Sequence, residues 1–262
     1  MSLDAKLGKI VKNLSELTEI PADEIEGEIR GYMSDGYSLM GGVATWKSNH
    51  KFQLGLGTSM EVKARVVGKR GRSQAEWSGG SGEVANVDFM TFDGGVLEVK
   101  PTTLWDDRID LLFDKFTLDG VYSFTAYERK AGGLIRIKPE SIKQLEDNKI
   151  PRVEELEAYN IKLPPLSKIQ EYAKTTNFFH GWVGRIIQDK ETGEPIGVEF
   201  ADRESMPVTA WFGGRFAKVP EEIVKITKSV KQGDEIYVYG YVSINNDGDG
   251  TLNTRGLFKV GA

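Results

Sequence analysis

A three-strand pattern that occurs twice is the feature of this chain that most constrains its fold. The first copy begins at Lys63 with the basic strand KARVVGKRGR and runs through EVANVDFMTF and GVLEVKPTTLW to a tryptophan. A weaker copy begins at Phe178 and ends in PVTAWFGG. A basic strand, a turn and an aromatic residue on the third strand suit a small barrel that holds nucleic acid by phosphate contact and base stacking. The spacing of about 115 residues indicates two copies of one domain.

Residues 58–140 are predicted to form the first β domain. Val62, Ala64 and Val66 fall on one face of an alternating strand, as expected when one side is buried. The polar, glycine-rich stretch RGRSQAEWSGGSGE that follows is predicted to be a loop. EVANVDFMTF and GVLEVKPTTLW flank an FDGG turn and form a hairpin. A helical link, DDRIDLLFDKF, then leads to two further strands, GVYSFTAYER and GLIRIKP.

Residues 178–262 repeat this order. Three strands precede a helical link, FAKVPEEIVKITKSV, and two strands follow it, DEIYVYGYVSI and LNTRGLFKV. Five strands with a helix between the third and fourth match the five-stranded Greek-key barrel known as the OB-fold. The predicted fold class is therefore mainly β, with two OB-fold barrels in tandem and a small N-terminal helical element.

Two segments fall outside the barrels. Residues 1–51 show helical spacing of apolar residues in their first part and a glycine-rich exit afterwards. Residues 141–177 are charged and are interrupted by Pro151 and by the pair Pro164 and Pro165. Because prolines inside a charged stretch favour an extended chain, this segment is predicted to be a linker that acts as a spacer.

Composition narrows the classes of function. The 262 residues include no cysteine, which removes disulfides, thiol nucleophiles and thiolate metal sites and fits a reducing, cytoplasmic and nucleoid-associated location. No long apolar run or signal peptide is seen, so no membrane partner is expected. The net charge of −5 argues against a uniformly basic face that coats duplex DNA. Local fields still decide whether nucleic acid binds.

No catalytic residue, cofactor or metal site is predicted, and the protein is expected not to be an enzyme. His50 and His180 lie in different segments and, without cysteine, supply no zinc ligand set. The aspartates that follow Trp105 match the solvated face of the link helix better than a two-metal cluster. No phosphate-binding loop motif of nucleotide hydrolases is present.

Basic residues are the candidates for phosphate contact. Residues 63–72 carry five basic groups and no acidic one, and counterion release favours phosphate binding by such groups. The alternative is a solvated strand face. The basic candidates are Lys63, Arg65, Lys69, Arg70, Arg72, Arg129 and Arg136 in the first barrel and Arg185, Arg215 and Arg255 in the second.

Aromatic residues are the candidates for base stacking. Trp105 and Trp211 occupy equivalent places in the two copies, although a core tryptophan that closes one end of a barrel is the alternative. Trp211 and Phe212 are adjacent, so one of them points outward in a regular strand. Tyr241 shares a strand face with two other tyrosines, and some of the three are expected to line a groove, since buried hydroxyls need partners. The aromatic candidates are Trp77, Phe92, Trp105, Tyr127, Trp211, Phe212 and Tyr241.

The run VDFMTFDGGVLEVKPTTLWDDRIDLLF resembles replication protein A type single-stranded DNA-binding proteins, most closely archaeal versions with tandem OB-folds. The resemblance covers residues 58–138 and 178–260. It implies that Trp105 is the base-stacking aromatic of the first barrel and Trp211 that of the second. The chain departs from the family by lacking a cysteine zinc module. It also places Asp106 and Asp107, whose charges repel phosphate, directly after the first tryptophan.

Two hypotheses follow. In the first, the protein coats and protects single-stranded DNA in replication, recombination and repair, with the strand running across both barrels and with replication or repair proteins as further partners. In the second, it is a protein–protein adaptor in such an assembly, which the net acidity favours. RNA binding is not separated from DNA binding, because a contact to the 2′-hydroxyl leaves no sequence motif. The oligomeric state stays open.

Overall fold

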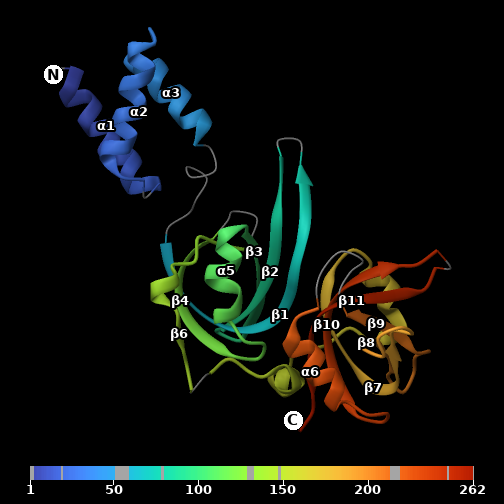
Figure 1. The fold of residues 1–262 in the computed structure, drawn as a ribbon. Helices are drawn as coiled ribbons and strands as arrows, with labels where there is room; N and C mark the ends of the chain where they lie inside the picture. The colour runs from blue at the N-terminus through green and yellow to red at the C-terminus, as the bar shows by residue number, and fades with distance from the viewer. Residues whose placement is uncertain are drawn as a thin grey trace. The chain divides into compact units, whose positions relative to one another are not determined.

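The computed structural model shows two compact units, a helical unit that comes first in the chain and a β unit that follows it (Figure 1). Within the described part of the chain, no helix is both long and apolar enough to span a membrane. The side chains of Leu17 and Trp77 lie outside the description. The structure describes residues 3–18, 20–50, 59–77, 80–128, 133–146, 149–212, 219–246 and 248–261.

In the described part of the helical unit, three helices pack together: α1 (Leu3–Thr18), α2 (Ala22–Ser34) and α3 (Leu39–Asn49). One apolar stripe from each helix meets the others, as expected for amphipathic helices. The buried residues of this core are Leu7, Val11, Leu14, Ile25, Ile29, Val43 and Trp46.

Helix α3 occupies the stretch in which the sequence predicts a glycine-rich break. Ser38 begins the helix, because its hydroxyl accepts a hydrogen bond from the backbone N–H of Gly41 at 3.1 Å. Gly42 is buried, and a methyl group there would lie 3.3 Å from the carbonyl oxygen of Ile29. This glycine therefore allows α3 to approach α2 closely, and the helix is stabilised by packing despite a weak intrinsic propensity.

The second β module is a closed barrel with the strand order β10-β11-β9-β8-β7. Its helix α6 (Glu221–Ser229) lies between the third and fourth strands, and β11 pairs with β9 in parallel. This is the OB-fold order, so the predicted fold class is confirmed. Its strands are β7 (Thr176–Gln188), β8 (Pro195–Ala201), β9 (Val208–Phe212), β10 (Glu235–Ile244) and β11 (Gly250–Lys259).

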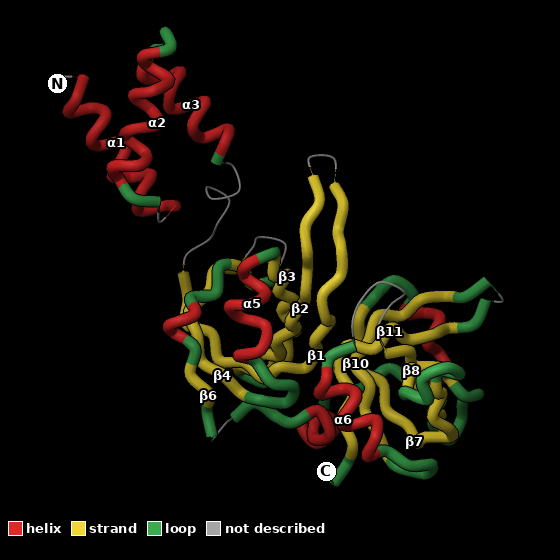
Figure 2. The backbone as a smooth tube through the Cα atoms, viewed as in Figure 1, coloured by secondary structure: helices red, strands yellow, loops and turns green. Residues whose placement is uncertain are grey.

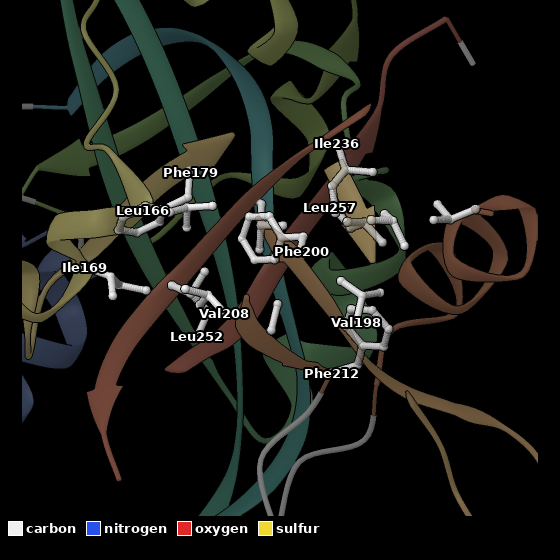
Figure 3. Close-up of a cluster of buried hydrophobic side chains, with 14 of the residues drawn as sticks. Leu166, Ile169, Phe179, Val198, Phe200, Val208, Phe212, Ile236, Leu252 and Leu257 are labelled. Atoms are coloured by element: carbon white, nitrogen blue, oxygen red, sulfur yellow. The ribbon is translucent and has the colours of Figure 1, made fainter. Parts of the chain in front are cut away.

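Alternation explains the core of this barrel. Val198 and Phe200 of β8 point inward, as do Leu252 and Leu257 of β11, and they meet Phe179 of β7 (Figure 3). Because successive strand residues point to opposite faces, Glu199 between Val198 and Phe200 lies on the outside, while an irregular register opposite Gly240 lets both Leu252 and Leu257 point inward. The outer face of the barrel is therefore fixed residue by residue.

The first β module has the same strand order, β3-β2-β1-β4-β5, in an antiparallel sheet to which β6 adds by pairing with β4. Strand β5 contacts β3, the neighbour that closes an OB-fold barrel. Helix α5 (Asp107–Leu112) and the 3₁₀ helix η1 (Phe113–Lys115) lie between β3 and β4. The strands are β1 (Ser59–Trp77), β2 (Gly80–Asp93), β3 (Val96–Trp105), β4 (Val121–Glu128), β5 (Leu134–Ile135) and β6 (Lys143–Gln144).

Strands β1 and β2 are longer than the sequence predicts. The stretch expected to be a polar loop continues the ladder, with Arg70 opposite Asn86 and Gln74 opposite Glu83. Figure 2 shows this paired ribbon extending beyond the other strands of the module. Alternating polar residues without a buried face still form strands here, because each backbone group finds a partner on the neighbouring strand.

The connector between the modules is packed, and not the extended spacer that its prolines predict. It forms the 3₁₀ helices η2 (Pro139–Ser141), η3 (Val153–Tyr159) and η4 (Leu166–Tyr172). Val153 and Leu156 are fully buried between the modules. Prolines begin and end such short turns without preventing the apolar residues between them from reaching a core.

The two modules share a hydrophobic core of their own. Val67 and Met90 of the first module meet Tyr239 and Phe258 of the second beneath the connector. Gly256 permits the closest approach, since a methyl group there would overlap the carbonyl oxygen of Val67. The buried residues of this shared core are Val67, Met90, Val121, Ile150, Val153, Leu156, Phe178, Tyr237, Tyr239 and Phe258.

Two ion pairs cross the same boundary. Arg255 of β11 donates to the buried carboxylate of Asp88 on β2 at 3.0 Å. Lys69 of β1 donates to Glu222 of α6 at 2.9 Å. Burial raises the pKa of Asp88, while the charge and hydrogen bond of Arg255 lower it. Removing one partner of such a buried pair leaves an uncompensated charge.

Arg255→Met is therefore expected to destabilise the protein by about 3–5 kcal/mol at neutral pH. Burial holds the folded-state pKa of Asp88 above its unfolded value, and the loss of Arg255 raises it further. Stability linked to a raised pKa is complete below the unfolded pKa, near 4, and is lost as the pH rises. The cost measured by urea unfolding should thus be larger at neutral pH than in acid.

Arg185→Met is the matched control, because Arg185 forms an exposed pair with Glu199. It should cost at most about 1 kcal/mol. Equal losses for the two variants, or a cost of Arg255→Met that does not depend on pH, would contradict the role of the buried pair.

Candidate nucleic-acid interface

Trp211 lies on the outside of the second barrel. Val208, Ala210 and Phe212 of β9 point into the core, and the indole of Trp211 between them is 37% exposed. The sequence predicts that one of the adjacent residues Trp211 and Phe212 points outward. The structure shows that Trp211 does so and that Phe212 points inward. Phe212 cannot contact a ligand from the core, so its assignment as a binding residue is corrected.

A glycine makes room for this indole. Gly197 of β8 is opposite Trp211, and a methyl group at Gly197 would lie 3.2 Å from Cε3 of the ring. The ring therefore packs against the backbone of β8 on one side, while part of its surface remains open to solvent. A supported, partly exposed aromatic ring is what base stacking requires.

A polar residue and an aromatic residue lie beside Trp211 on the next two strands of the barrel. Asn253 of β11 is in register with Trp211 on one side and with Tyr241 of β10 on the other. Neighbouring strands lie about 4.8 Å apart, so the backbones of Trp211 and Tyr241 lie on either side of Asn253 and about 10 Å from each other. The Asn253 amide donates to the hydroxyl of Ser243 at 2.8 Å, which holds its orientation. We call Trp211, Asn253 and Tyr241 the barrel row.

Arg185 is an exposed arginine near this row in strand register. It pairs with Glu199, which lies two residues from Gly197 on β8. Two hydrogen bonds of 2.7 and 2.6 Å join the guanidinium to the carboxylate, and this contact raises the pKa of Arg185. The guanidinium is exposed, but Glu199 already occupies the edge that a phosphate would bind.

The predicted phosphate track along residues 63–72 is corrected in large part. Arg65 is buried and donates to the carbonyl oxygens of Ile150 and Pro151 and to the carboxylate of Asp119, so it secures the connector. Lys69 is buried as well, and its ammonium donates to Phe116 and Glu222 and lies 4.3 Å from the centre of the Phe113 ring.

Arg72 and Arg255 are also engaged by carboxylates. Arg72 binds Glu83 and Asp110, which raises its pKa. Arg255 binds Asp88 between the modules, so its assignment to phosphate is likewise corrected. Lys63 and Arg70 remain exposed.

The first module exposes fewer of its candidate binding residues than its sequence predicts. Phe92 packs against Tyr159 of the connector, with ring centres 5.3 Å apart, and so lies under the connector. Tyr127 is buried near the end of β4, and Arg136 is half-buried after β5. Because these side chains are covered, the structure does not support a path of single-stranded DNA across both barrels over this face.

Trp105 is 39% exposed at the end of β3, opposite Val84. The carboxylate of Asp106 accepts a hydrogen bond from the backbone N–H of Glu83 at 2.9 Å, which ties it to β2. Asp107 is exposed in the first turn of α5.

Three candidates are not placed by the structure. Arg129, Arg215 and the side chain of Trp77 lie outside the described residues.

Trp182 is an aromatic residue that the sequence argument missed. Its ring lies 5.1 Å from that of His180, and the guanidinium of Arg203 lies 5.8 Å from it. Alternation along FFHGWV places Phe178, His180 and Trp182 on one strand face, which was the available signal. Tyr237 stacks on His180 in the boundary between modules, and thus does not line a groove.

Comparison with known proteins finds distant structural likeness only. No family model matches the chain, and no curated protein sequence does. A replication protein A heterotrimer bound to ssDNA matches 78% of this chain at 15% identity and a TM-score of 0.49. This chain spans 49% of the matched chain, about half its length.

Two further solved structures match similar shares of the chain. The p204 HINb domain matches 76% of this chain and 95% of its own, at 13% identity and a TM-score of 0.38. A murine DNA binding protein bound with ds DNA matches 76% of this chain and 97% of its own, at 14% identity and a TM-score of 0.33. Likeness this distant does not carry a function from one protein to another.

The exposure of the indoles is measurable in solution. Trp46 is fully buried, whereas Trp105 and Trp211 are more than a third exposed. We expect Trp211→Phe to lower the fraction of tryptophan fluorescence that acrylamide quenches, because it removes an accessible emitter. Trp46→Phe should raise that fraction. A reversed order would place the Trp211 indole in the core and remove the candidate site.

Proposed function

We propose that this protein binds single-stranded nucleic acid on the outer face of its second barrel. The observation that carries the proposal is the barrel row, in which a supported indole, a fixed amide and a phenol lie side by side on three adjacent strands. An unpaired base stacks on the indole, and the Asn253 amide contacts a base edge or the backbone. The protein acts by binding, without a catalytic step.

Single-stranded ligands suit this surface better than duplexes. Stacking on Trp211 requires a base whose face is free, which paired bases do not offer. Duplex binding depends on many phosphate contacts, yet the net charge is −5, and five of the eight predicted cations that the structure describes are held by carboxylates. Binding is therefore led by stacking and tolerates different sequences.

The cellular role that follows is the protection of single-stranded DNA during replication, recombination and repair. The bases of RNA stack in the same way as those of DNA, so a competition experiment between RNA and DNA oligonucleotides is needed to tell which one the protein prefers. Replication or repair proteins are the further partners we expect.

An adaptor that binds proteins only is the second candidate. The engagement of Arg65, Lys69 and Arg255 inside the fold favours it, since these cations leave no phosphate track. A chain that fails to bind any oligonucleotide at low salt, while its fold is intact, would support the adaptor.

The first test is a fluorescence anisotropy titration with labelled oligo-dT, oligo-U and duplex DNA. We expect oligo-dT to bind more tightly than the duplex, and Trp211→Ala to weaken oligo-dT binding by about 1–3 kcal/mol through the loss of one stacked base. Met206→Ala is the matched control, because Met206 is 84% exposed in the same barrel and outside the barrel row.

Trp105→Ala locates the site. An effect smaller than that of Trp211→Ala supports the second barrel. A larger effect, together with unchanged binding by Trp211→Ala, would move the site to the first module and overturn the assignment.

The second test concerns charge. Among the described residues near the barrel row, Arg185 is held by Glu199, so we expect the logarithm of the binding constant to fall with the logarithm of salt with a slope of about −1 to −2. Glu199→Gln should release Arg185 for phosphate, which tightens oligo-dT binding and steepens the slope by about 0.7. Glu191→Gln, on an exposed turn of the same barrel, should leave both unchanged. A steep slope in the unmodified protein would show that a cationic track exists elsewhere.

A further inference from the structure

The helical unit carries an apolar groove that its own core does not fill. The groove lies between α1 and the start of α3 and has a volume of about 540 Å³. Leu3 and Met40 line it and are 53% and 66% exposed. Ile10 and Leu39 form its floor, since they pack against the core of the unit on their other side. Side chains so large and so exposed in a small unit mark an interaction surface.

Positive charge lies along one wall of the groove. Lys6 and Lys9 of α1 line it, and among the described residues no carboxylate lies within ion-pair distance of either ammonium. Asp4, the acidic residue in the first turn of the same helix, is held by Arg30 at 2.9 Å. An apolar floor beside uncompensated lysines is complementary to an apolar stripe flanked by acidic residues.

The length of the groove fits a helix. It follows α1 from Leu3 to Asn13, which corresponds to about 15 Å at the rise of an α-helix. Three anchors spaced i, i+3 or i+4, and i+7 on a bound helix span about 10.5 Å and therefore fit within this length. An extended peptide would gain no backbone partners here, since α-helices offer no open edge of the kind a strand does.

We propose that this groove binds an acidic amphipathic helix of a partner protein. Apolar side chains of that helix occupy the space between Leu3, Ile10 and Met40, and its acidic residues face Lys6 and Lys9. The proposal is independent of nucleic-acid binding by the barrels, because it uses residues of the helical unit alone.

The probe is a synthetic, fluorescein-labelled helical peptide of about fifteen residues, long enough to form a helix, with leucines at i, i+3 and i+7 and glutamates between them. A second peptide keeps the leucines and replaces the glutamates with lysines. Anisotropy titrations with the full chain should show that the acidic peptide binds at least about tenfold more tightly than the basic one.

Matched variants test the groove. Lys6→Glu combined with Lys9→Glu should weaken binding of the acidic peptide by about tenfold or more and favour the basic peptide. Lys12→Glu combined with Lys47→Glu makes the same change in net charge on exposed positions outside the groove, and should have a much smaller effect. Met40→Ser should weaken both peptides, and because Met40 is exposed it should leave the circular dichroism spectrum unchanged.

Two outcomes would overturn the proposal. One is equal binding of the two peptides, or equal effects of the two charge-reversed pairs. The other is self-association of the chain in sedimentation that Met40→Ser abolishes, without any peptide binding, because the groove would then hold a second copy of this protein. Oligo-dT binding measured on the same variants should not change, which separates this site from the barrel row.

Discussion

The packing of Val67 against Tyr239 and Gly256 determines which surfaces of the β unit remain available to a partner. It joins the two modules through a shared apolar core, and the buried pair between Asp88 and Arg255 lies beside it. Apolar burial supplies the stabilising free energy. The ion pair makes the alignment of the two modules specific, because a shifted interface would leave a buried charge without its partner. This contact buries Val67 of β1 and Asp88 and Met90 of β2, so these positions are not open to a partner.

That contact also determines which side chains are available to bind a ligand. Five cations that alternate along the first strand suggest a phosphate track, yet Arg65 and Lys69 end on carbonyl and carboxylate oxygens inside the fold. Electrostatic attraction to a polyanion is correspondingly weak. What remains on the second barrel is an aromatic surface with a fixed amide, which recognises nucleobases better than it recognises charge. The proposed function therefore depends on Trp211 more than on any arginine.

The helical unit follows a different logic. Its core is closed by Trp46, Ile25 and Ile29, yet Leu3 and Met40 are left outside it, next to lysines without a carboxylate partner in the described chain. A protein with a base-stacking barrel and a separate helix-binding groove would couple nucleic acid to a second protein. The two sites use different forces, so that salt and mutation act on them independently.

Local patterns along the chain were sufficient for most strands and for the helical links of both modules, but not for the continuation of β1 and β2 through the stretch predicted to be a loop. Alternation identifies a strand because the buried face depends only on neighbours two residues apart, and it also showed that Trp211 and Phe212 point in opposite directions.

The partners of charged side chains could not be found this way. Arg255 meets Asp88 at a separation of 167 residues, and Lys69 meets Glu222 at 153. Helix α3 and the packed connector were missed for the same reason, since close approach at Gly42 and burial of Leu156 exist only once distant segments meet. Which residues form strands was thus a local property of the sequence, whereas which charges reach solvent was decided by tertiary contacts.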